Sequence, residues 1–384
     1  MKRCVVAGHI CLDLIPEIDH AFDLVPGRLY EVGPAVMATG GAVSNTGVAL
    51  HLLGVPTTLM GKIGDDAFGA AVRTVLRGYG AELDRGLVVA PGGITSYTVV
   101  VNIPGRDRTF LHCPGANHTF GAEDVAPAGL AGAALFHFGY PPIMARTYAD
   151  GGRELEAIFR KAKDAGLSTS LDLVMPDPSG PSGRADWPAV LARTLPLTDV
   201  FLPSADELLF MLDRDHFGAG DRLAAPALSA LTERLLGMGV AIAGLKLGSR
   251  GLFLRTGSAA RLAAMGAAAP ADCAAWAGRE LWFPVFTIPK FVGATGAGDT
   301  TIAGFFAAFL RGQDPVGCGR FANAVGSCNV QTADALSGIK SWEETQALLD
   351  RGWATDPLTL SEAPGWRQDA ATGVWFGPRD AGRG

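Results

Sequence analysis

The stretch GATGAGDT at residues 293–300, which runs on as TIAGFFAAFL to residue 310, constrains the architecture of this chain more than any other segment. It has the pattern of a glycine-rich turn that opens an apolar helix. Glycines at 293, 296 and 298 allow backbone N–H groups to turn toward one point, and the start of a helix adds unpaired donors and the positive end of its dipole. The stretch therefore predicts a binding site for an anion such as phosphate.

Neither of two familiar phosphate-binding motifs accounts for this stretch. A Walker loop needs Lys and then Ser or Thr where this chain has Asp299 and Thr300, and the dinucleotide fingerprint needs a further glycine at position 301. Asp299 can be interpreted as a helix cap, or as a general base that accepts the proton of an attacking hydroxyl. The residues alone leave both interpretations open, although three glycines in six residues exceed what a cap needs.

The composition is that of a globular protein with small-molecule partners. Of 384 residues, 48% are hydrophobic, which is enough for one large core or two modest ones. The formal net charge of −6 provides no attraction for nucleic acid or an anionic membrane, and no apolar run approaches the length of a membrane span. The six cysteines include no Cys-x-x-Cys pair, so we expect neither a zinc site nor disulfides, but reduced thiols in the cytoplasm.

Short apolar runs alternate with helical segments along most of the chain, which predicts a parallel sheet covered by helices. A β-branched hairpin at 94–112 and an irregular excursion at 17–37 interrupt this order and predict a small sheet that forms a lid over the site. We expect a loop-rich insertion at 256–284 and a tail rich in Pro and Gly from about residue 353. Strands are expected within 5–10, 57–66, 134–139, 168–173, 200–203 and 240–254, and helices within 39–54, 67–78, 151–165, 187–195, 225–236, 298–310 and 315–330.

Four polar residues stand where open α/β sheets bind ligands, near strand ends or in the first turn of a helix. Asp13 follows the first strand, and Asn45 follows the Gly40-Gly41 pair. Glu207 follows the strand that ends at 203, and Lys246 interrupts an apolar run, which is costly unless it faces an anion. Instead of contacting a ligand, Asn45 could cap its own helix, and Glu207 could be a solvated acid in the first turn of a helix. The histidines at 9, 51, 112 and 137 match no metal-ligand spacing, so we expect them to pack in the core or the lid.

Taken in order, these motifs resemble those of the PfkB, or ribokinase-like, family of carbohydrate kinases, and the likeness spans residues 4 to about 345. The segments GGAVSN at 40–45 and GKIGDDAFG at 61–69 resemble the N-terminal signature of the family. The segment GAGDTTIAG at 296–304 resembles its C-terminal signature. Between them, the Pro203…Glu207 element and the KLGSRG segment at 246–251 also match.

The resemblance implies a doubly wound αβα core with a small β-sheet lid, and commonly a homodimer formed through the lids. It implies a kinase domain over residues 1–350, with a lid from about 14–38 and 93–115, and a C-terminal extension over 351–384. Carried onto this sequence, it makes Asp299 the catalytic base and the backbone of Gly296, Ala297 and Gly298 an anion hole. It assigns ATP contacts to Ser204, Lys246, Gly248, Gly251 and Asn323, a Mg²⁺ role to Glu207, and sugar contacts to Asp13, Gly41 and Asn45.

The sequence departs from the family pattern at two positions. Ser204 replaces an asparagine near the phosphates, and Gly293 replaces an acid that in ribokinase-like members helps to hold a monovalent cation. Dependence on K⁺ is therefore an open question, whereas ATP and Mg²⁺ are expected. A nucleoside kinase of the same fold and a ligand-binding regulatory protein without kinase activity stay as alternatives.

The glycine pair also bears on the class of substrate. It continues as Ala42-Val43-Ser44 with no basic residue, whereas sugar-phosphate branches of the family resemble Gly-Gly-Lys at that point. A phosphorylated substrate normally needs a cluster of Arg or Lys to hold it. We therefore expect an unphosphorylated sugar or sugar acid. The alternative is a sugar phosphate held by positive charge from the lid residues Arg28, Arg106, Arg108 and His112.

Overall fold

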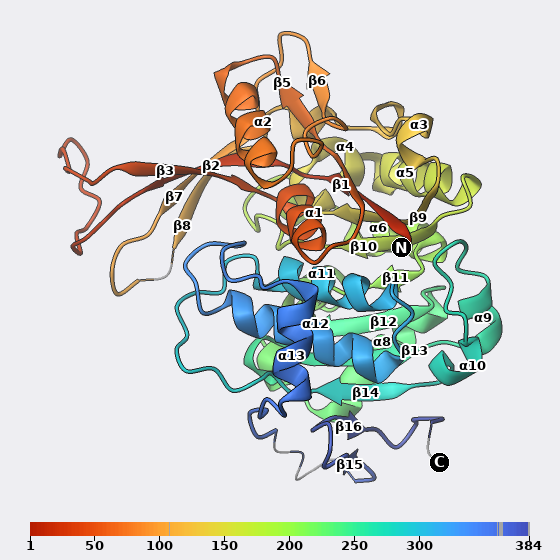
Figure 1. The fold of residues 1–384 in the computed structure, drawn as a ribbon. Helices are drawn as coiled ribbons and strands as arrows, with labels where there is room; N and C mark the ends of the chain where they lie inside the picture. The colour runs from red at the N-terminus through yellow and green to blue at the C-terminus, as the bar shows by residue number, and fades with distance from the viewer. Residues whose placement is uncertain (107, 359, 361–363, 383–384) are drawn as a thin grey trace.

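The computed structural model describes residues 1–384 except 107, 359, 361–363 and 383–384, and its centre is one large sheet (Figure 1). The described part of this sheet has ten strands in the order β15-β16-β14-β13-β12-β11-β10-β9-β1-β4. Their bounds are β1 Arg3–Gly8, β4 Thr57–Met60, β9 Ala133–Gly139, β10 Ser168–Asp172, β11 Val200–Phe201, β12 Ile242–Lys246, β13 Leu252–Thr256, β14 Glu280–Phe283, β15 Arg367–Gln368 and β16 Trp375–Phe376.

The strands from β4 to β12 in this order run parallel, and the remaining neighbours pair antiparallel. Strands such as β9, with the sequence AALFHFG, are buried along their whole length because helices cover both faces of the sheet. The predicted parallel sheet and fold class are confirmed. The carboxyl ends of the parallel strands meet at one edge, where such sheets bind ligands.

Two hydrophobic cores lie on the two faces of the sheet, and each helix packs into one of these cores. One face carries α1 Ala42–Leu52, α2 Ala67–Tyr79, α9 Ala259–Ala263, α10 Cys273–Trp276, α11 Ala297–Phe309, α12 Pro315–Asn329 and α13 Trp342–Asp350. The other carries α3 Pro127–Leu130, α4 Ala145–Tyr148, α5 Arg153–Asp164, α6 Trp187–Thr194, α7 Ala205–Leu212 and α8 Ala225–Gly237. No helix in the part of the chain that the structure describes is long and apolar enough to cross a membrane.

A second sheet of four strands stands off the main body and forms the lid (Figure 1). Its order is β3-β2-β7-β8, with β2 Cys11–Pro16, β3 Ala35–Gly40, β7 Tyr97–Val101 and β8 Thr109–Cys113. The predicted hairpin and excursion thus meet in one sheet, although β2 begins three residues before the expected lid boundary at 14. A third, two-stranded sheet joins β5 Lys62–Gly64 to β6 Val88–Ala90.

The prediction of a loop-rich insertion at 256–284 is wrong for its last residues. They form β14, a buried strand of the main sheet that pairs with β13 and β16. The helices α9 and α10 have five and four residues, too few to produce a helical period in the sequence. The tail likewise continues the main sheet, since β16 pairs with β14 and β15 with β16. The strands β15 and β16 of the tail therefore extend the central sheet beyond β14 (Figure 1).

Candidate active site

The predicted anion site lies at the start of α11. Gly296 is the N-cap residue of this helix and has a φ of 68°, a left-handed conformation that favours glycine. The N–H of Ala297 donates to the carbonyl of Ala294 at 3.2 Å, whereas those of Gly298 and Asp299 donate to no residue that the structure describes. Among the described residues, the N–H of Gly296 likewise has no acceptor, so two of the three predicted donors are available and a turn hydrogen bond occupies the third, the amide of Ala297.

Asp299 is 2% exposed, and three side chains hold its carboxylate. The hydroxyl of Tyr140 donates to Oδ2 at 2.7 Å, and the amide of Asn45 donates to the same oxygen at 3.0 Å. The hydroxyl of Thr46 donates to Oδ1 at 3.3 Å. Burial raises the pKa of Asp299, while these donors and Lys246 act in the opposite direction. Gly296, not Asp299, is the helix cap, so the alternative interpretation of this aspartate as a cap is wrong.

Tyr140 is a site residue that the sequence did not single out. It follows the last residue of β9 and has φ 69° and ψ 41°, the left-handed conformation that costs most side chains about 1–2 kcal/mol. Such strain is common at functional sites, and here it accompanies a hydroxyl that bonds Asp299. Burial, and then the charges of Asp299 and Asp172, raise the pKa of Tyr140, so its hydroxyl stays a neutral donor.

Lys246 at the end of β12 forms an ion pair with Asp172 at the end of β10, with 2.8 Å between Nζ and Oδ1. Burial disfavours the charged ammonium, but Asp172, Glu207 and Asp299 outweigh it and raise the pKa of Lys246. Burial also raises the pKa of Asp172, and the charge of Lys246 opposes it. A Cβ added to Gly298 would lie 3.1 Å from the ammonium nitrogen. The predicted cation thus sits directly against the glycine turn.

Ser204 and Glu207 form a capping box at the start of α7. The carboxylate of Glu207 accepts from the N–H of Ser204 at 2.7 Å, and the hydroxyl of Ser204 accepts from the N–H of Glu207 at 3.2 Å. Glu207 is therefore a fixed group rather than a freely solvated one, and its side chain lines the main cavity. A single carboxylate beside phosphate oxygens suits Mg²⁺, which usually binds one or two protein carboxylates and keeps several waters.

The main cavity has a volume of about 780 Å³ and two chemically different ends. Asp172, Lys246, Glu207 and Asp299 lie at the polar end with the glycine turn, and Val285, Phe286, Ile288, Phe291 and Val330 form an apolar wall. Gly248, Gly251 and Asn323 also line it, as predicted for a nucleotide pocket. The amide of Asn323 donates to the carbonyls of Phe283 and Pro284 at 2.7 and 3.0 Å, which fixes the side chain against the end of β14.

The predicted sugar contacts Asp13, Gly41 and Asn45 lie outside the lining of this cavity, and of the three, Asn45 bonds Asp299. Asp13 lies on the lid strand β2 rather than at the end of β1, and its carboxylate accepts from the thiol of Cys11 at 3.3 Å. Burial raises the pKa of Asp13 to about 6. Gly41 precedes α1 and contacts His9, and Asn45 in the same helix has a buried Oδ1 without a hydrogen bond among the described residues. That oxygen is placed to accept from a ligand hydroxyl.

Of the four predicted packing histidines, His9 and His137 are buried, His51 is partly buried, and His112 lies exposed on the lid strand β8. The rings of His9 and His112 lie 5.1 Å apart, and those of His9 and Tyr140 lie 6.3 Å apart. His137 is buried within β9, where burial lowers its pKa to about 3. Among the residues that the structure describes, no three His, Cys, Asp or Glu side chains form a metal-ligand group.

Comparisons with known proteins agree with this geometry. The sequence model of the pfkB family carbohydrate kinases matches residues 1–342. The chain belongs to this family. It is therefore a carbohydrate kinase, a phosphotransferase that acts on a hydroxyl group, as the resemblance of the motifs predicted.

Two relatives and one solved structure illustrate the similarity. The chain is 27% identical over 293 residues to an uncharacterized sugar kinase of Archaeoglobus fulgidus, which covers 76% of this chain and 98% of that protein. It is 25% identical over 320 residues to fructokinase of Vibrio alginolyticus, which covers 82% and 86% of the two chains. The structure of Arabidopsis thaliana ribokinase complexed with ribose and ATP superposes with a TM-score of 0.69 at 21% identity, covering 91% of this chain and 98% of that one. This structural likeness confirms the ribokinase-like fold.

Proposed function

We propose that the chain transfers the γ-phosphate of Mg²⁺–ATP to a hydroxyl of a small unphosphorylated sugar or sugar acid. The observation that carries the proposal is the position of Asp299. Its buried carboxylate is fixed by three donors between the polar end of the main cavity and the side chains under the lid. A base in this position is able to serve a hydroxyl on one side and a phosphoryl donor on the other.

The reaction uses these groups in a direct displacement. The sugar oxygen forms a bond to the γ-phosphorus, the bond from that phosphorus to the bridging oxygen breaks, and ADP leaves while Asp299 takes the hydroxyl proton. The free amides of Gly298 and Asp299 and the ammonium of Lys246 stabilise the charge on the transferred group. Glu207 would help to hold Mg²⁺, which neutralises charge on the phosphates when it is bound.

The charges under the lid favour an unphosphorylated substrate. Residues 42–44 of α1 are Ala, Val and Ser, which offer no cation. Burial lowers the pKa of both His9 and His112, so these rings are neutral at pH 7. Arg106 at the lid hairpin pairs with Asp23 at 2.5 Å and is more than half exposed. None of these groups therefore forms a cluster of cations that would hold a second phosphate.

Exposed apolar side chains on both faces of the lid sheet support a homodimer formed through the lids. Val36 and Met37 of β3 and Phe110 and Leu111 of β8 are 54–61% exposed, and Leu29 in the loop between β2 and β3 is 81% exposed. Apolar side chains gathered on a projecting sheet mark an interaction surface. We further propose a cytoplasmic location, in line with six free cysteines.

The test is ADP release with a panel of acceptors. Fructose, ribose and 2-keto-3-deoxygluconate are compared by kcat/KM with fructose 1-phosphate, fructose 6-phosphate and adenosine. The proposal expects one of the first three to exceed both phosphate esters and the nucleoside. A preference for an ester or the nucleoside contradicts the substrate class, and no ADP release with any acceptor favours a regulatory protein.

The role of Asp299 is tested with the active acceptor. Asp299→Asn should retain ATP binding and reduce kcat by about 10²-fold or more, the usual scale for loss of a general base. Asp186→Asn, at the N-cap of α6 on the other face of the sheet, is the matched control. Turnover of Asp299→Asn equal to that of the control would overturn the assignment.

A further inference from the structure

The C-terminal tail contributes a carboxylate to the main cavity, although it lies beyond the match to the family. The family match ends at residue 342, and Asp356 is one of the cavity-lining residues. Asp356 is partly buried, and the other acids of this cavity, Asp172, Glu207 and Asp299, are grouped at the polar end with Lys246. A separate acid supplied by the tail has no role in the phosphoryl transfer described above.

Short-range contacts hold Asp356 beside the apolar wall of the cavity. Its backbone N–H donates to the carbonyl of Val285 at 2.9 Å, and its Oδ1 accepts from the hydroxyl of Thr287 at 2.6 Å. Just before it, Thr355 forms an antiparallel bridge with Phe286, and the ring of Trp353 stacks on that of Phe286 at 4.8 Å. Val285 and Phe286 belong to the apolar wall, so the carboxylate stands next to the surface that suits a nucleobase.

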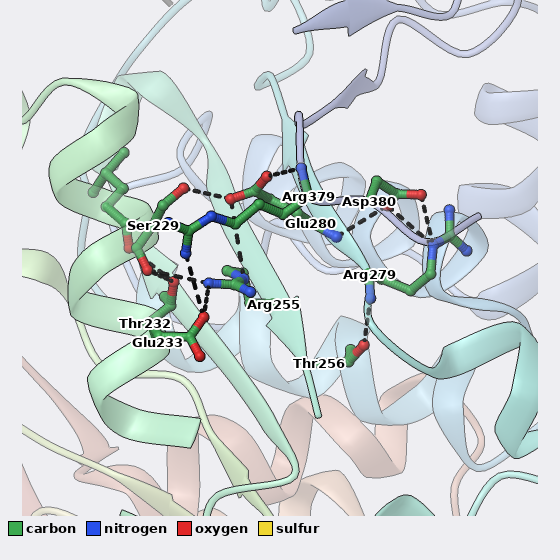
Figure 2. Close-up of polar contacts among 10 residues, drawn as sticks. Ser229, Thr232, Glu233, Arg255, Thr256, Arg279, Glu280, Arg379 and Asp380 are labelled. Atoms are coloured by element: carbon green, nitrogen blue, oxygen red, sulfur yellow. Dashed lines mark hydrogen bonds and ion pairs between the residues drawn. The ribbon is translucent and has the colours of Figure 1, made fainter. Parts of the chain in front are cut away.

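The rest of the tail is fastened to the main sheet by buried polar contacts (Figure 2). Oδ2 of Asp380 accepts from Nε of Arg279 at 3.0 Å and from the N–H of Glu280 at 2.9 Å. Glu280, which is fully buried in β14, accepts from the N–H of Arg379 at 2.8 Å and from the hydroxyl of Ser229. The tail is thus fixed to the main sheet at Asp356 and again at Arg379 and Asp380, so Asp356 belongs to a built wall of the cavity.

We propose that Asp356 accepts a hydrogen bond from the nucleoside part of the bound nucleotide and thereby contributes to nucleotide selection. Among the described residues, Thr287 is its side-chain donor, and it bonds Oδ1 alone. A carboxylate repels phosphates, so its favourable partners in a nucleoside triphosphate are the ribose hydroxyls and the N–H groups of the base. The inference rests on the proposed use of this cavity for ATP.

The test is Asp356→Asn, which keeps an oxygen for Thr287 and removes the negative charge and one acceptor. The variant should raise KM for ATP about tenfold, as expected for a hydrogen bond to a charged group, with little change in kcat. Asp369→Asn is the matched control, because its carboxylate bonds only residues of its own turn among those described. Equilibrium binding of the nonhydrolysable analogue adenosine 5′-(β,γ-imido)triphosphate should weaken in Asp356→Asn and not in the control.

Further measurements identify the nucleotide group that bonds Asp356 and distinguish this inference from the proposed kinase function. If a ribose hydroxyl is the partner, the tenfold difference between wild type and Asp356→Asn disappears with 2′-deoxy-ATP or 3′-deoxy-ATP. If the base is the partner, the difference persists with both and changes when GTP replaces ATP. Unchanged KM and analogue binding in Asp356→Asn overturn the inference while wild-type turnover still supports the kinase. Absence of wild-type turnover with every acceptor speaks against the proposed function, and analogue binding then still tests Asp356.

Discussion

Replacing Tyr140 with Phe tests how the protein keeps Asp299, the proposed base, ionised. The substitution retains the ring and the left-handed backbone of residue 140, and removes the hydroxyl that donates to Oδ2 of Asp299 at 2.7 Å. Burial raises the pKa of Asp299 and the Tyr140 hydrogen bond lowers it, so the variant should have a higher pKa at this carboxylate. Because the base works only when it is ionised, the loss of rate should be largest at low pH.

The size of the effect follows from the contact. A hydrogen bond to a charged group contributes about 1.5–3 kcal/mol, and one pKa unit corresponds to about 1.4 kcal/mol. The full effect would therefore be an upward shift of about one to two units. Asn45 and Thr46 still donate to the carboxylate, so we expect a shift near the lower limit, about one unit. Below the new pKa, kcat/KM should fall about tenfold.

The assay is the pH profile of kcat/KM for the active acceptor, in wild type and Tyr140→Phe. In the variant, the acidic limb of the profile should shift to higher pH, and the rates of the two proteins should converge at high pH. Tyr148→Phe provides the control, because Tyr148 packs against Trp187 away from the site. A rate loss that is the same at every pH would refute the electrostatic role and indicate a purely steric one.

Three further outcomes are expected. KM for the sugar should rise as the pH falls through about 6, because Asp13 gains a proton there and loses its acceptor character, and Asp13→Asn should abolish that pH dependence in a KM titration. Turnover should depend strongly on Mg²⁺ and weakly on K⁺, because Gly293 supplies no carboxylate; strong stimulation when K⁺ is added to a buffer free of K⁺ and Na⁺ would contradict this. Met37→Lys with Leu111→Glu should convert the proposed dimer to a monomer in sedimentation velocity, with Val89→Lys, an exposed residue outside the lid sheet, as control; an unchanged sedimentation coefficient would exclude the lid interface.

The sequence predicted the fold and singled out Asp299 because both depend on local patterns. The glycine turn, the apolar helix after it and the alternation of strands and helices are features of neighbouring residues. Lys246 was found for a similar reason, since a cation in an apolar run needs a local explanation. Its partner Asp172 was not found, because 74 residues separate the two and only the parallel pairing of strands brings them together.

Other parts of the site were hidden by length and by tertiary contact. The strands of the tail have two residues each, so their alternation cannot be seen in the sequence. Tyr140 was missed because its conformation and its bond to Asp299 are set by packing, although its place directly after β9 was a usable signal. From the sequence, the amide of Ala297 was included in the anion site, but in the structure this amide donates to the carbonyl of Ala294. Such a turn hydrogen bond could not be predicted because it leaves no pattern in the residue types.

The junction between the lid and the body gives the two substrates of the proposed reaction binding surfaces of different mobility. Only two residues separate β1 from β2. The chain leaves the main sheet at Gly8, passes through β2 and β3 of the lid, and re-enters the body of the protein at Gly41, just before α1. The φ angles of these two glycines are 121° and 86°. Glycines with such angles absorb rotations that other residues resist. A rotation of the lid about them would displace Asp13 and leave Lys246, Glu207 and the tail on the rigid sheet. The nucleotide would then bind to a preformed surface, while the affinity for the sugar would vary with the angle of the lid.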